Sequence, residues 1–136
     1  MNIMSIIIKN SQLGPETMES LDKLTDLDIN AAIAFKLTRI IKEISSIVED
    51  KVKMERRILD KYSEKDEEGN VINPKDEQGN PIQGAVNITD IDSFSSEMKD
   101  LMEVESEIGY ERINFEDLNL KTAKVKDLMK LEFLFN

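Results

Sequence analysis

The chain has 136 residues, of which 40% are hydrophobic and 34% charged, a balance typical of a globular protein with one modest core. Its formal net charge of −10 disfavours nucleic acid and anionic lipid as partners, because both attract positive surfaces. It contains no Cys and no His, which excludes disulfides, thiolate nucleophiles, zinc–sulfur sites and the commonest general base. We therefore expect neither a nucleic acid nor a membrane among its partners.

The first quarter of the chain predicts one strand and one short helix. Met4–Lys9 reads as a strand, and its three consecutive Ile residues, Ile6–Ile8, indicate burial on both faces. Glu16–Thr25 reads as a short amphipathic helix with Pro15 in its first turn. Asp28 is expected to cap the helix that follows, by accepting hydrogen bonds from its free amides.

The run from Ile29 to Tyr62 predicts one long helix. It contains neither Gly nor Pro, and its apolar residues recur at alternating steps of four and three, with a second apolar row beside the first. At about 1.5 Å per residue such a helix spans roughly 50 Å, more than the rest of the chain can cover. We therefore predict a partner interface along it, which also includes two aromatic residues of the C-terminal tail. The predicted interface residues are Ile33, Leu37, Ile40, Ile41, Ile44, Ile47, Val48, Lys51, Met54, Ile58, Phe133 and Phe135.

Two features of this predicted interface have alternative interpretations. Lys51 interrupts the apolar row, either as a snorkelling side chain at the edge of the stripe or as a polar residue that sets the register of a helix–helix contact. The apolar tail Phe133–Phe135 either closes the core or docks onto a neighbour, because a terminus frays unless it is tied down.

Residues 64–85 hold an internal repeat and predict an exposed loop or a loose hairpin arm. Lys65–Ile72 is echoed ten residues later by Lys75–Ile82, and each copy contains a Gly-Asn pair that tolerates the positive φ of a tight turn, at Gly69 and at Gly79. Acids also cluster here, but they do not follow the alternating ligand spacing of a calcium loop. We therefore predict turns and no metal site.

The last third of the chain predicts further short elements. Val86–Ile88 reads as a short strand, and Thr89 is expected to cap a helix that ends near Glu105. Apolar residues alternate with polar ones from Ile108 to Phe115, which is typical of a strand or hairpin edge. Thr122 is expected to begin a last helix.

Together these elements predict an α+β protein that is mainly α. One long helix, about 29–62, is accompanied by two or three shorter helices and a small antiparallel or mixed sheet from the segments near Ile7, Ile108 and Ile113. We predict one domain, 1–136.

No motif predicts catalysis, a cofactor or a metal. No Gly is followed by Lys-Ser or Lys-Thr as in a phosphate-binding loop. Glu103, Glu105 and Glu107 would share one face of an extended segment, where solvated acids are the simpler interpretation. A hydrolase that uses only acids is the enzyme hypothesis left to consider.

Four segments of the chain resemble a family of small uncharacterised proteins encoded by tailed bacteriophages and prophages. These segments are Ile7–Leu13, Ala32–Lys42, Arg57–Gly69 and Asp127–Leu134, of which Arg57–Gly69 is the most specific. In the last segment, Phe133 follows Glu132 directly where similar proteins often have an intervening Pro. The resemblance implies a phage origin, placement among head and tail morphogenesis genes, and no catalytic residues.

The leading hypothesis is a non-enzymatic phage protein that acts through protein–protein contacts. It would be a multi-copy virion component, such as a head-tail connector, ring or tail-associated subunit, assembled in the cytoplasm of an infected bacterium. Its partners would be further copies of itself or other phage structural proteins. The alternative is a non-structural adaptor, either an assembly chaperone or an inhibitor of a host protein, whose acidic surface meets a basic target.

Overall fold

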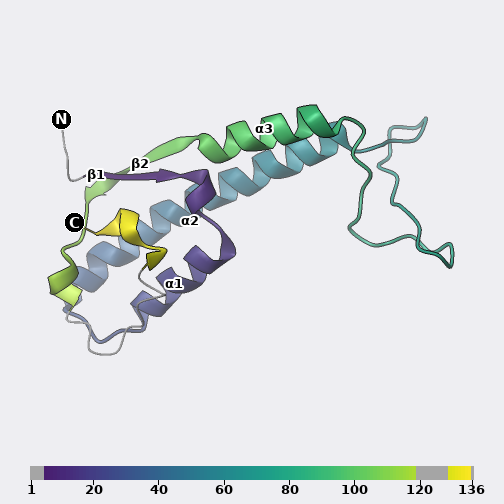
Figure 1. Ribbon diagram of the computed structural model, residues 1–136. Coiled ribbons are helices and arrows are strands. Elements are labelled where there is room, and N and C mark those ends of the chain that lie inside the picture. Colours follow the sequence, from purple (N-terminus) through teal and green to yellow (C-terminus); the bar gives the residue numbers. More distant parts are fainter. Residues whose placement is uncertain (1–4, 119–128, 136) are drawn as a thin grey trace. The chain divides into compact units, whose positions relative to one another are not determined.

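The computed structural model describes residues 5–118 and 129–135 (Figure 1). The fold is α+β and mainly α, as predicted, with one long helix and a two-stranded antiparallel sheet in the described part. The chain divides into two compact units, which are described separately below. The core unit comprises residues 1–50 and 102–136, and the hairpin unit comprises residues 51–101. The assignment of one domain to 1–136 stays a prediction.

The sheet belongs to the core unit. Strand β1 (Ser5–Lys9) pairs antiparallel with β2 (Glu105–Glu111), with a register irregularity at the start of β1. Ile6 and Ile8 are buried, whereas Ile7 between them is 48% exposed. The predicted burial on both faces of this strand is therefore wrong, because only one face of the sheet is packed.

Two helices of the core unit were anticipated by the sequence. Helix α1 (Pro15–Thr25) has Pro15 at its first position, where the missing amide hydrogen costs nothing. Helix α2 (Ala31–Tyr62) begins in the core unit and continues into the hairpin unit. Its cap is Asn30, whose Oδ1 accepts a hydrogen bond from the Ala32 amide at 2.8 Å. Asp28 is thus not the cap, because the helix begins later than the predicted residue 29.

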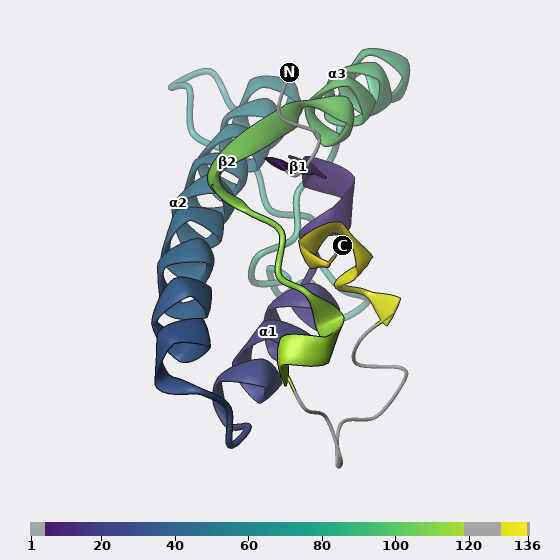
Figure 2. The ribbon, with the colours of Figure 1, turned by 90° about the vertical axis from the view of Figure 1, so that its left-hand side faces the viewer.

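The C-terminal tail closes the core of this unit. Leu134 is 0% exposed, and its carbonyl accepts a hydrogen bond from the Ile113 amide at 2.9 Å. Figures 1 and 2 show the tail between the sheet and α1. Buried hydrophobic side chains from both strands, from α1 and α2 and from the segments after β2 meet there. They are Ile6, Ile8, Leu13, Leu21, Leu24, Leu37, Ile40, Ile44, Ile108, Ile113, Leu118, Leu131, Phe133 and Leu134.

The end of the predicted sheet differs from the structure. Strand β2 stops at Glu111, and Ile113 makes only an isolated parallel bridge with Phe135. Phe115 begins a short 3-10 helix, η2 (Phe115–Leu118). Two others are η1 (Asn10–Gln12), directly after β1, and η3 (Glu132–Leu134), in the tail. The helix predicted from Thr122 falls largely outside the described residues.

The hairpin unit consists of two antiparallel helical segments joined by a long arm (Figure 1). The segments are residues 51–62 of α2 and residues 91–101 of α3 (Ile91–Glu103). Near the arm, the rings of Tyr62 and Phe94 pack edge to face with centroids 6.2 Å apart.

Helix α3 is capped by Asp90, whose carboxylate accepts a hydrogen bond from the Ser93 amide at 3.1 Å. The predicted cap, Thr89, instead hydrogen-bonds the Tyr62 carbonyl through its amide and its hydroxyl, at 2.8 and 3.1 Å. Of the predicted strand Val86–Ile88, the structure has only an isolated bridge between Ile88 and Ser63.

Candidate functional site

Most of the predicted interface is occupied by the protein's own core. Leu37, Ile40 and Ile44 are at most 1% exposed, and Phe133 is 7% exposed. Their assignment to a partner interface is corrected accordingly, because segments of the same chain already cover them. Five more of the predicted residues are partly buried and pack against that core, namely Ile33, Ile41, Ile47, Val48 and Phe135.

The three remaining residues of the predicted interface lie in the hairpin unit. The Lys51 side chain is 13% exposed, and its Nζ lies 3.5 Å from Glu55 Oε1, one helical turn away. Met54 is 42% exposed and Ile58 is half-buried. The assignment of these three residues and of the five partly buried ones to a partner interface stays a prediction.

The hairpin unit lacks a buried hydrophobic core. Residues 51–101, all of which the structure describes, contain no buried hydrophobic side chain. Several large apolar side chains are instead exposed on its helices: Val52 at 36%, Leu59 at 37% and Ile91 at 66%, in addition to Met54. Val52 and Leu59 belong to the second apolar row of the long helix, of which the predicted interface includes other members.

A groove of about 410 Å³ lies between the two helices of this unit. Apolar side chains of Met54, Ile58 and Leu101 line it together with the charged side chains of Arg57, Lys61 and Glu97. The groove therefore combines an apolar lining with charged groups, a combination common in protein recognition sites.

The charges along the groove are unequally paired. Lys61 Nζ and Tyr62 Oη both donate hydrogen bonds to Glu97 Oε1, at 2.6 and 2.8 Å. These bonds, the one from Lys61 first, lower the pKa of Glu97, and the same carboxylate raises the pKa of Lys61. Arg57 makes no ion pair with any residue in the described part of the chain, so the groove keeps an unmatched positive charge.

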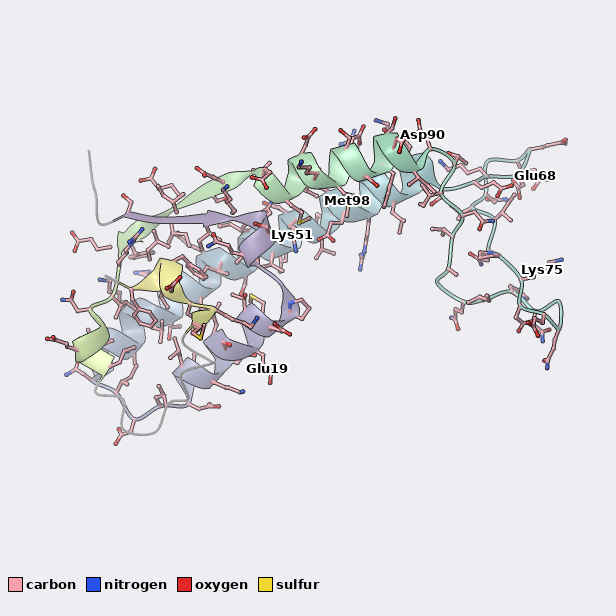
Figure 3. All side chains as sticks on the ribbon, viewed as in Figure 1. Glu19, Lys51, Glu68, Lys75, Asp90 and Met98 are labelled. Carbon is pink, nitrogen blue, oxygen red and sulfur yellow. The ribbon has the colours of Figure 1, made fainter. Side chains whose placement is uncertain are left out.

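The arm carries two copies of one turn, as the repeat predicted. Asp66 in the first copy and Asp76 in the second each accept hydrogen bonds from two backbone amides, all at 2.9 Å. The two side chains therefore play the same role in their turns. Gly69 and Gly79 have φ angles of +87° and +83°, which L side chains rarely adopt. Figure 3 shows the arm, with Glu68 and Lys75 labelled, beyond the end of the helix pair.

The acids that could have formed a catalytic face do not share one extended segment. Glu103 ends α3 and pairs with Lys9 at 3.2 Å, whereas Glu105 and Glu107 lie on β2. Within residues 5–118 and 129–135, no group of three or more acidic side chains is arranged to hold a metal ion. Over the same residues, no helix is both long and apolar enough to cross a membrane.

Comparison with protein-family models, with curated proteins and with solved structures finds no match to this chain. The geometry of the hairpin unit and the residues quoted above are therefore the basis for a functional proposal.

Proposed function

We propose that this chain is a non-enzymatic bacteriophage protein that acts through protein–protein contacts as a multi-copy virion component, such as a connector, ring or tail-associated subunit. The observation that carries the proposal is the hairpin unit, which exposes apolar side chains and buries none. The phage assignment rests on the resemblance of the sequence.

The energetic argument concerns the side chains that this chain leaves uncovered. Fully burying a large aliphatic side chain stabilises a protein by roughly 1.5–3 kcal/mol. In the core unit that stabilisation is already realised at residues such as Ile44. In the hairpin unit Met54, Leu59 and Ile91 remain 42%, 37% and 66% exposed, so a partner that covers them would gain this stabilisation; exposed apolar surface often marks an interaction site.

The test combines a surface variant with the mass of the protein in solution. The double variant Met54→Ser/Leu59→Ser should remain folded and should shift the wild-type assembly toward the monomer, as measured by light scattering. Met129→Ser is the matched control, because Met129 lies in the core unit and is 68% exposed. Mass spectrometry of purified phage particles should detect the wild-type chain in many copies. Its absence from particles would contradict a virion role.

The acidic net charge favours the second candidate, a non-structural adaptor such as an assembly chaperone or an inhibitor of a host protein. A strongly salt-sensitive interaction with a basic protein, together with absence from mature particles, would select this candidate over the first.

A further inference from the structure

We propose that the acidic arm of one copy, residues 65–82, docks into the groove between α2 and α3 of a second copy. This inference rests on the proposed multi-copy role and names the contact that would join one copy to the next.

The first argument is charge complementarity within the hairpin unit. Residues 51–62 of α2 contain five basic and two acidic residues, although the whole chain is strongly acidic. Lys53, Arg56 and Arg57 make no ion pair in the described part of the chain. Residues 65–82 contain five acidic and two basic residues, so the arm and the helix carry opposite charge. Opposite potentials on two surfaces speed their encounter and fix their register.

The second argument is that the arm also offers apolar side chains. Val71 is 37% exposed and Ile82 is 45% exposed, one in each copy of the repeat and both next to an acidic turn. The groove offers a matching apolar lining and the positive charge of Arg57, while the second cation of its lining, Lys61, is paired with Glu97.

The third argument is preorganisation. Each turn is closed by its own hydrogen bonds, from the Ile72 amide to the Glu64 carbonyl at 2.9 Å and from the Ile82 amide to the Pro74 carbonyl at 2.8 Å. A segment that already has its bound shape loses less conformational entropy on docking.

The arm leaves the groove of its own chain open. None of the residues that line the groove belongs to the arm, which departs after Ser63. Figure 3 shows Glu68 and Lys75 on the far side of that departure point. A second copy can therefore supply the occupant of the groove. Because arm and groove are different surfaces, the contact is head to tail and builds either a closed ring or an open chain.

A charge exchange tests the contact. The arm variant is Glu67→Lys/Glu68→Lys/Glu77→Lys. The groove variant, Lys53→Glu/Arg56→Glu/Arg57→Glu, changes the lining residue Arg57 and two exposed basic residues next to it on α2. Each alone should associate at least about tenfold more weakly than the wild type in sedimentation equilibrium, because like charges then face each other. An equimolar mixture of the two should regain the wild-type mass, since every arm in the mixture finds an oppositely charged groove.

The control is Asp22→Lys/Asp26→Lys/Asp28→Lys, which changes the net charge as much as the arm variant does but at exposed positions of the core unit. It should not weaken association. The inference is overturned by folded arm and groove variants that assemble like the wild type, by a mixture that stays dissociated, or by a wild-type chain that is monomeric at every concentration. The proposed function is judged separately by the presence of the chain in purified particles.

Discussion

One apolar row of helix α2 is covered in the core unit and partly exposed in the hairpin unit. Leu37 and Met54 belong to one apolar row of α2, yet Leu37 is 1% exposed and Met54 is 42% exposed. In the core unit, strands and the C-terminal tail cover the row, whereas in the hairpin unit only α3 and the arm accompany it. A heptad pattern thus specifies which face of a helix is apolar, and segments distant in sequence decide whether that face is covered.

The strongest test of this difference places a charge in the same apolar row of α2, once in the core unit and once in the hairpin unit. Ile44→Asp puts an unpaired carboxylate at a position that is 0% exposed, and it should destabilise the protein by more than about 4 kcal/mol. Urea denaturation followed by circular dichroism measures the loss. Ile58→Asp, at a half-buried position of the hairpin unit, is the paired variant and should stay folded. A folded Ile44→Asp protein would contradict the core described here.

A smaller effect is expected from the N-terminal cap of α2. Asn30→Ala removes the acceptor for the Ala32 amide and should lower the free energy of unfolding by about 1 kcal/mol. Asn30→Asp keeps an acceptor and is the control. Equal stability of all three proteins in urea would show that the helix begins elsewhere.

The arm offers a local perturbation confined to the hairpin unit. Gly69→Ala forces a side chain into a left-handed turn at a cost of about 1–2 kcal/mol, which should open that turn without lowering the global stability. Amide hydrogen exchange should speed up around residue 69 and remain unchanged in the second copy of the turn. Gly69→Asn should behave closer to the wild type, because Asn tolerates this conformation.

The smallest effect concerns pH. The pKa of Glu97 lies below its ordinary value of 4.5, so its contribution to hairpin stability is complete above that pH and is lost as the pH falls through the lowered pKa. Glu97→Gln should remove this part of the acid dependence, as followed by NMR signals of Tyr62 and Phe94. Asp100→Asn, an exposed change on the same helix, should leave it intact. An identical acid response in wild type and Glu97→Gln would contradict the pairing.

Local sequence signals predicted the elements better than the surfaces. The absence of Gly and Pro predicted α2, Pro15 predicted the start of α1, and the Gly-Asn pairs predicted both turns of the arm. These features depend on residues close together in the chain. Burial of Ile8 and exposure of Ile7 depend instead on packing against distant segments. The uninterrupted apolar run Ile6–Ile8 has no periodicity that could predict them.

The candidate site was only partly predictable for the same reason. Met54 and Ile58 belong to the apolar row of α2, so their place in the candidate site could be predicted. Glu97 could not be assigned from the sequence, because its bond to Lys61 joins residues 36 positions apart. Such a pairing depends on how α3 folds back onto α2.

The duplicated turn means that the reach of the arm is adjustable in fixed steps. Each ten-residue copy closes its turn with hydrogen bonds of its own, so adding or deleting one leaves the flanking helices with the same attachment points at Ser63 and Ile88. Even doubling a flexible loop adds only about 0.6 kcal/mol of closure entropy. The length of the arm can thus change in steps of ten residues without altering the rest of the fold.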